Sequence, residues 1–195
     1  MSSPALALKR ILGVLQGLGI RYCLGGSVAS AIHGVARPTL DVDLVVDLGP
    51  ETALLFATEL KSEFYLDEDQ ILEALRRGRA FNLIHLESSY KFDFFPIGDA
   101  EWPAEQLSRG SKAIANLFGE EALEFVVASA EDVVIAKLQW YRAGGCSSER
   151  QWGDLRGVVA ARGPRLDLAY LRRWATRLQV SDLLEKLLAE SASEN

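Results

Sequence analysis

The sequence contains very few of the residues that build disulfide frameworks and zinc sites. Only two cysteines and two histidines occur among its 195 residues. Cys23 and Cys146 are too few for a disulfide framework, and together with His33 and His85 they show no spacing typical of zinc ligands. We therefore expect two reduced thiols in a cytoplasmic protein, with both histidines packed in the fold or lying at its surface.

Long apolar runs and an excess of positive charge are also missing. The apolar runs are short, as in residues 44–46, so no segment is expected to span a membrane. Residues 1–10 carry basic side chains only at Lys9 and Arg10, and we expect no signal peptide. The formal net charge is −6, which gives no support for non-specific binding to nucleic acid, although a local basic patch stays open.

What the sequence does contain is enough apolar material for a packed interior, since 49% of its residues are hydrophobic. Periodicity predicts a mixed α/β region over residues 1–128 and a mostly helical region over residues 129–195. We therefore expect an α/β fold with a small mixed β-sheet flanked by helices, followed by a helical C-terminal subdomain. The predicted helices are 4–18, 28–33, 51–60, 102–107, 129–142, 149–161, 166–177 and 181–189, and the predicted strands are 21–24, 39–46, 81–86, 90–95 and 123–127.

The clearest chemical pattern is Asp41-Val42-Asp43, within the predicted strand 39–46. Residues i and i+2 of a strand point to the same face, so the two aspartates lie side by side while Val42 faces the other way. Two neighbouring carboxylates repel each other unless a cation lies between them, and a divalent cation with oxygen ligands meets that need. The alternative is that both aspartates lie on a solvated face of the sheet.

A third carboxylate, Asp93, falls on the predicted strand 90–95. Phe92 and Phe94 share one face of that strand, and Asp93 lies on the other. If this strand is a neighbour of strand 39–46, three carboxylates converge, and three acids on adjacent strands can hold two Mg²⁺ ions that clamp a triphosphate. The sequence therefore predicts a site for divalent metal ions, Mg²⁺ or Mn²⁺, held by these three aspartates.

Gly25, Gly26 and Ser27 form a second pattern, between the predicted strand 21–24 and the predicted helix 28–33. The glycines allow a tight turn and a close approach to a ligand. Ser27 begins a short helix, where free backbone N–H groups and the helix dipole favour phosphate. The alternative is an ordinary turn from strand to helix. The pattern is not a Walker motif, because no Gly-Lys-Ser/Thr follows, and no nucleophile elbow of a serine hydrolase is present.

Residues 22–29 and 34–46 carry these two patterns, and together they resemble the nucleotidyltransferases of the DNA polymerase β superfamily. They are most similar to the branch that contains the AbiEii toxins and the MenT-like proteins of type IV toxin–antitoxin systems. That branch shares a Gly-Ser loop, a short helix and an Asp-x-Asp strand. The resemblance covers roughly residues 5–160. It implies a nucleotidyltransferase-like fold in which Gly26 and Ser27 contact the triphosphate.

Two motifs of the same branch recur in the helical region. Residues 129–138 resemble its lysine-bearing helix, which implies that Lys137 meets the triphosphate. Residues 149–155 resemble its later acidic motif, which implies that Asp154 orients Lys137 or another group of the site. The usual second acid of that motif is missing, so the role of Asp154 stays open. The alternative for Lys137 is a helix lysine whose charged end reaches solvent.

The activity implied by the resemblance is transfer of a nucleoside monophosphate from an NTP to an acceptor hydroxyl, with release of pyrophosphate. Asp41 and Asp43 would bind the metal ions, and Asp93 would act as general base toward the hydroxyl. A cleft between the α/β region and the helical region would hold the metal-bound NTP.

The fold alone does not choose the acceptor. An RNA end, especially that of a tRNA, a protein side chain and a small molecule such as an aminoglycoside all stay open. The toxin-like branch adds a cognate antitoxin protein as an expected partner, and no membrane partner is expected. Two alternatives from other classes are a catalytically silent nucleotide-binding or protein-interaction module of the same fold, and the regulatory partner in a two-protein operon.

Overall fold

The structure is a computed structural model that describes residues 3–34, 36, 39, 41–119 and 121–193. The chain forms two compact units, which we call the sheet unit and the helical unit. The sheet unit comprises Met1–Gly25 and Thr39–Val127, and the helical unit comprises Gly26–Pro38 and Ala128–Asn195. The short helix before the Asp-x-Asp strand thus belongs to the helical unit. The two units are therefore not continuous in sequence, unlike the expected regions 1–128 and 129–195.

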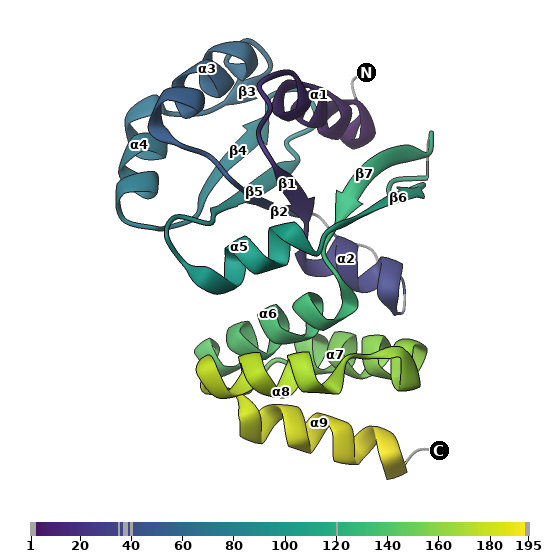
Figure 1. The fold of residues 1–195 in the computed structure, drawn as a ribbon. Helices are drawn as coiled ribbons and strands as arrows, with labels where there is room; N and C mark the ends of the chain where they lie inside the picture. The colour runs from purple at the N-terminus through teal and green to yellow at the C-terminus, as the bar shows by residue number, and fades with distance from the viewer. Residues whose placement is uncertain (1–2, 35, 37–38, 40, 120, 194–195) are drawn as a thin grey trace. The chain divides into compact units, whose positions relative to one another are not determined.

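The sheet unit is built on a mixed sheet with seven strands among the described residues, in the order β3-β4-β5-β2-β1-β7-β6 (Figure 1). Strand β2 runs parallel to β5, and β1 runs parallel to β7, whereas the other neighbouring strands are antiparallel. The strands are β1 (Tyr22–Leu24), β2 (Asp41–Val46), β3 (Phe64–Tyr65), β4 (Phe81–His85), β5 (Lys91–Pro96), β6 (Ser111–Ala115) and β7 (Leu123–Val127).

The sheet unit also contains four helices among its described residues. They are α1 (Pro4–Gly17), α3 (Pro50–Leu60), α4 (Glu68–Arg76) and α5 (Glu101–Ser108). Helix α3 contacts both α1 and α4, while α5 contacts β2, and Figure 1 shows α1, α3 and α4 grouped at one side of the sheet.

The core of the sheet unit lies on one face of its central strands. Val42 and Leu44 on β2, and Phe92 and Phe94 on β5, are fully buried. Phe56 of α3 meets Phe94 edge to face, with ring centroids 5.3 Å apart, so α3 covers this face. Burying each such side chain stabilises the fold by roughly 1.5–3 kcal/mol. The apolar faces predicted for the two strands are therefore confirmed.

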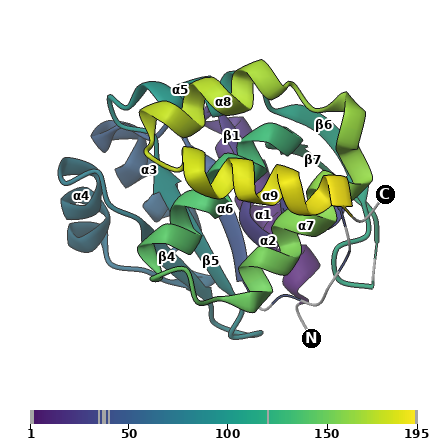
Figure 2. The ribbon, with the colours of Figure 1, turned by 90° about the horizontal axis from the view of Figure 1, so that it is seen from below.

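The helical unit is a group of short helices. They are α2 (Gly26–His33), α6 (Ala130–Ala143), α7 (Glu149–Arg162), the 3₁₀ turn η1 (Gly163–Arg165), α8 (Leu168–Arg177) and α9 (Ser181–Ser193). Helix α6 contacts α2, α7 and α8, and α9 contacts α7 and α8 (Figures 1 and 2). The predicted start of α6 is confirmed, because the Ser129 hydroxyl accepts a hydrogen bond from the backbone N–H of Asp132 at 3.2 Å.

Helix α2 ends against α7 with almost no space between the two backbones. A Cβ atom on Gly34 would lie 2.7 Å from the backbone nitrogen of Val158 and 2.8 Å from the carbonyl carbon of Gly157. Just before this point, His33 Nε2 donates to the carbonyl oxygen of Ala128 at 2.7 Å, and His33 Nδ1 accepts from the Arg162 guanidinium at 3.0 Å. The donation from Arg162 requires that the His33 proton sits on Nε2. His33 is therefore a packing residue, as expected.

Besides the 3₁₀ turn η1, three elements among the described residues were not predicted from the sequence: β3, α4 and β6. Strand β3 has only two residues, too few to show an alternation. Strand β6 lies at the edge of the sheet, and its residues are exposed or half-buried, so it lacks an apolar face. Helix α4 buries only Ile71 and Ala74. The predicted strand 39–46 begins at Asp41 in the structure, and its residue 40 lies outside the described residues.

Within the described part of the chain, no helix combines the length and the apolar character needed to cross a membrane.

Candidate functional site

The central feature of the candidate site is the polar face of β2 and β5. The two strands are parallel neighbours, and their register sets Asp43 opposite Asp93 and Asp41 opposite Lys91. Because side chains alternate along a strand, these four residues share one face, opposite the buried Phe92 face. We call these four residues the acid face. The register therefore brings the three aspartates together as the sequence pattern indicated, while their roles stay predictions.

The carboxylate of Asp41 is held at the start of β2. The Thr39 hydroxyl donates to Asp41 Oδ1 at 2.7 Å, and the Tyr90 hydroxyl donates to the carbonyl oxygen of Thr39 at 2.5 Å. Partial burial and the negative charge of Asp41 raise the pKa of Tyr90 above its usual value, so this hydroxyl keeps its proton and remains a donor. The two hydrogen bonds thus link Asp41 to the residue that precedes β5.

Lys91 is the cation of the acid face. Its Nζ lies 2.6 Å from Asp93 Oδ2, and the side chains of Lys91 and Asp93 are 44% and 17% exposed. The hydrogen bond with Asp93 raises the pKa of Lys91, and the negative charges of Asp93, Asp41 and Asp43 raise it further against the opposing effect of burial. All three carboxylates therefore act on one ammonium group.

The chemistry of this donor set fits a hard divalent cation, because carboxylate oxygens are the ligands that Mg²⁺ and Mn²⁺ prefer. In the described ranges of the chain, however, no three histidine, cysteine, aspartate or glutamate side chains are already arranged around one point that could hold a metal ion. Asp93 instead holds the ammonium group of Lys91 at 2.6 Å. The acid face therefore has the ligands for a metal ion, but their side chains would have to reorient to bind it.

The Gly-Gly-Ser segment lies where the sheet unit passes into the helical unit. The backbone N–H of Gly25 donates to the carbonyl oxygen of Asp43 at 2.9 Å, which ties the end of β1 to β2. Gly26 has a backbone φ of +51°, a conformation that residues other than glycine rarely adopt. Ser27 follows in the first turn of α2, which confirms its predicted place at a helix N-terminus. Ser27 and Asp41 belong to different units, and the expected orientation of the Ser27 hydroxyl toward Asp41 stays a prediction.

Lys137 and Asp154 form an ion pair inside the helical unit. Lys137 Nζ lies 2.8 Å from Asp154 Oδ2, and the two side chains are only 8% and 7% exposed. The alternative in which Lys137 extends its charged end to solvent is therefore wrong. The pairing agrees with the implied role of Asp154 in orienting Lys137. An ammonium group carries three N–H donors, so this bond alone does not exclude a phosphate as a further acceptor.

Sequence reasoning missed three residues beside the aspartates. Lys91 could have been found, because it lies two positions before Asp93 on the same strand and therefore shares its face. Tyr90 and Thr39 gave no signal, because their contact joins a side chain to a main-chain carbonyl 51 positions away in sequence.

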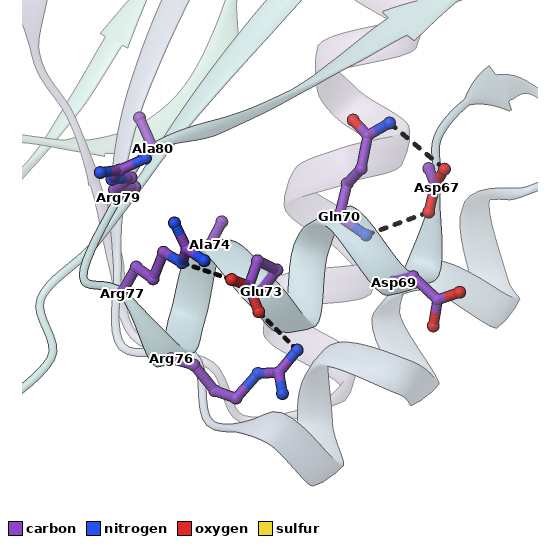
Figure 3. Close-up of a pocket in the computed structure, with 9 residues that line it drawn as sticks. All are labelled: Asp67, Asp69, Gln70, Glu73, Ala74, Arg76, Arg77, Arg79 and Ala80. Atoms are coloured by element: carbon purple, nitrogen blue, oxygen red, sulfur yellow. Dashed lines mark hydrogen bonds and ion pairs between the residues drawn. The ribbon is translucent and has the colours of Figure 1, made fainter.

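A second group of charged residues surrounds an open hollow at α4 and the residues that follow it (Figure 3). Arg76 and Arg77 both pair with Glu73, and Asp67 accepts hydrogen bonds from Gln70. Because these groups pair with one another within α4 and its two capping residues, the hollow offers no reactive constellation comparable with the acid face.

No family model and no curated protein matches the sequence. Solved structures do match. An antigenic nucleotidyltransferase-like protein from Paracoccidioides brasiliensis matches with a TM-score of 0.50 at 19% identity, covering 97% of this chain and 94% of that one. The solution structure of the antibiotic-resistance factor ANT(2'')-Ia matches with a TM-score of 0.52 at 16% identity, covering 95% and 98%.

A crystal structure of ANT(2'')-Ia in complex with adenylyl-2''-tobramycin matches with a TM-score of 0.55 at 12% identity, covering 89% of this chain and 95% of that one. At identities this low the structural matches show the fold alone, and the activity has to be argued from the site. The mixed sheet with its parallel β2–β5 pair and flanking helices is therefore a nucleotidyltransferase-like fold.

Proposed function

We propose that this protein transfers a nucleoside monophosphate from an NTP to an acceptor hydroxyl in a reaction that depends on a divalent metal ion. The observation that carries the proposal is the register of β2 and β5, which sets Asp41, Asp43 and Asp93 on one face of two adjacent strands. A structural role alone gives no reason to place three carboxylates on one face of two adjacent strands, because neighbouring like charges repel one another.

The proposed roles follow from the chemistry of each group. Asp41, Asp43 and Asp93 would hold Mg²⁺ or Mn²⁺, and the bound ion would supply positive charge that neutralises the triphosphate. The N-terminus of α2, with Gly26 and Ser27, would donate backbone N–H groups to phosphate oxygens, and Gly25 would allow the backbone to approach them.

In the proposed reaction the acceptor oxygen attacks the α-phosphorus of the NTP, and its proton passes to the carboxylate of Asp93. The bond between the α-phosphorus and its bridging oxygen breaks, and pyrophosphate leaves. Lys137, oriented by Asp154, would contribute positive charge to the triphosphate.

A small hydroxyl-bearing molecule is the acceptor that we favour over an RNA end. The chain is similar over nearly its whole length to ANT(2'')-Ia, one structure of which holds adenylyl-2''-tobramycin, a small molecule that carries a nucleotidyl group. The formal net charge of −6 disfavours a polyanionic acceptor and favours a cationic one. The AbiEii-like branch, with an RNA end as acceptor and an antitoxin as partner, stays a prediction, as does the cytoplasmic location.

A labelling experiment tests this function. The purified protein is incubated with each α-³²P-labelled NTP, Mg²⁺ or Mn²⁺, and one of three acceptor pools: tobramycin and related hydroxyl-rich compounds, total RNA, or lysate protein. We expect label in the small-molecule pool. Label in RNA would support the AbiEii-like branch instead. Nucleotide binding without transfer to any pool would identify a catalytically silent module and contradict the proposal.

A further inference from the structure

The position of Lys91 on the acid face has a consequence beyond the proposed activity. Lys91 is opposite Asp41 in the β2–β5 register and bonds to Asp93, two positions further along its own strand. Because the register also sets Asp43 opposite Asp93, the ammonium group belongs to the same face as all three carboxylates. One tethered positive charge thus stands among the groups that would ligate a divalent ion.

Lys91 and a divalent ion would compete for the same oxygen atoms. Nζ of Lys91 lies 2.6 Å from Asp93 Oδ2, which is hydrogen-bond distance, and a metal ion at this carboxylate would be a second cation at very short range. Like charges this close repel strongly in a partly buried site. Asp93 therefore cannot keep both partners in the same geometry.

We propose that Lys91 is a tethered cation that neutralises the acid face and is displaced from Asp93 when a divalent metal ion binds. The proposal rests on the proposed function, because it assumes that the three aspartates ligate the ion. It implies that metal binding is less favourable than it would be without Lys91, because the ion must first break the ion pair between Lys91 and Asp93. The cost is small enough to be overcome, because the Lys91 side chain is 44% exposed and a solvated ion pair of this kind is weak.

The physical character of lysine suits this exchange. Its ammonium group is a compact charge on a flexible stem of four carbon atoms, so it can leave Asp93 for solvent without moving β5. In both arrangements the acid face then has a cation beside its carboxylates, either Lys91 or the metal ion. The three aspartates can stay together in either arrangement.

Titration with Mn²⁺ alone, followed by calorimetry and by the electron paramagnetic resonance of the free ion, tests the proposal. We compare the wild-type protein with Lys91→Met, which keeps the length of the stem and removes the charge. We expect Lys91→Met to bind Mn²⁺ about fivefold more tightly, the change that corresponds to loss of a competing ion pair worth ~1 kcal/mol. Lys91→Arg, which restores a cation, should return the affinity toward the wild-type value.

Lys112 offers a matched control. It is a lysine on the edge strand β6, and its Nζ pairs with Glu124 at 2.9 Å. Lys112→Met therefore also removes a strand lysine from an ion pair, but far from β5 in the order of the sheet. Its affinity for Mn²⁺ should stay that of the wild type, which separates displacement at the acid face from the general effect of a lost positive charge.

Thermal melts give a second readout. Without divalent ions Lys91→Met should melt below the wild type, because three carboxylates lose their cation, and Mn²⁺ should remove that difference by binding the folded state. A lysine with only a packing role would lower the melting temperature equally with and without Mn²⁺, and this result would overturn the proposal.

The outcomes separate the two hypotheses. If Lys91→Met binds Mn²⁺ with the wild-type affinity while Asp43→Asn loses binding, the metal site stands and the displacement of Lys91 is wrong. If neither the wild type nor Lys91→Met binds Mn²⁺ at millimolar concentration, with or without ATP, the metal-dependent function falls together with the proposal. Should Lys91→Met fail to fold, Lys91→Gln replaces it in both measurements.

Discussion

Two lysine–aspartate ion pairs, one in each compact unit, differ mainly in their exposure to solvent. The pair of Lys91 and Asp93 lies on the sheet with side chains 44% and 17% exposed, while the pair of Lys137 and Asp154 is 8% and 7% exposed. Their N···O distances, 2.6 and 2.8 Å, are similar. Geometry alone therefore does not distinguish a fixed ion pair from an exchangeable one. Solvent exposure distinguishes them, because water stabilises the separated charges of a surface pair and cannot reach those of a buried pair.

Stability should depend most strongly on the buried pair. Lys137→Met should lower the free energy of unfolding by roughly 3–5 kcal/mol, because the buried carboxylate of Asp154 loses its ammonium partner. Urea unfolding followed by circular dichroism measures it. The double variant Lys137→Met/Asp154→Leu should recover most of the loss, since it buries no charge. Lys91→Met should lower the free energy of unfolding by less than ~1 kcal/mol in the same assay. Equal losses for both lysines would contradict the idea that exposure to solvent distinguishes the two ion pairs.

The next prediction concerns activity on the acid face. Asp43→Asn should reduce nucleotidyl transfer by at least ~100-fold, about 2.7 kcal/mol of transition-state stabilisation, and leave the stability in the absence of divalent ions unchanged or higher. The reason is that neutralising one of three neighbouring carboxylates relieves repulsion but removes a metal ligand. Label transfer and thermal melts measure the two effects.

Asp47→Asn is the control for this variant. Asp47 directly follows β2 and lies outside the four residues of the acid face, and its carboxylate pairs with Arg21 at 2.7 Å. It should keep full transfer. If Asp43→Asn lost stability and kept transfer, the acid face would be structural and the proposed site would be wrong.

A smaller effect tests how closely the helical unit is packed. Gly34→Ala should cost about 1–3 kcal/mol, because the added methyl group would meet backbone atoms of α7 at 2.7 and 2.8 Å, and backbone atoms cannot rotate away. Gly13 in α1 is the contrasting case, with nothing within 4 Å of an added Cβ. Gly13→Ala should instead stabilise the protein by ~0.5–1 kcal/mol. Guanidinium unfolding of both variants gives the comparison.

The smallest expected effect is a pH dependence in the same helical unit. Burial lowers the pKa of His33 from its ordinary 6.5, and the nearby Arg162 charge lowers it further against the hydrogen bond to Ala128. The folded state therefore binds a proton at His33 less readily than the unfolded state does. Its contribution to stability is complete above pH 6.5 and is lost as the pH falls below that value.

Melting temperatures from pH 7.5 to pH 5 measure this contribution. His33→Gln keeps a donor for the carbonyl oxygen of Ala128 but cannot titrate, so its melting temperature should fall less than that of the wild type over this range. An identical decline in both proteins would assign the pH dependence to other groups.

The alternation of side chains was enough to predict which face of β2 and β5 carries the aspartates. Because side chains alternate along a strand, the sequence places Asp93 on the face opposite Phe92 and Phe94. Burial of the aromatic face then leaves the other face for the acids. The helix starts followed from local side-chain hydrogen bonds, as at Ser129. These features depend on residues close together in the chain, so local sequence was sufficient to predict them.

Other features required contacts between distant residues. The pairing of β2 with β5, the burial of Lys137 against Asp154 and the grouping of α2 with the C-terminal helices all join segments far apart in the chain. The sequence shows that Lys137 and Asp154 are charged, but their burial against each other becomes visible only in the folded chain. Lys91 is the intermediate case: its face is set by its own strand, but its place among three carboxylates exists only because β5 lies beside β2. Electrostatic and packing energies depend on separation in space, and separation along the sequence does not encode it.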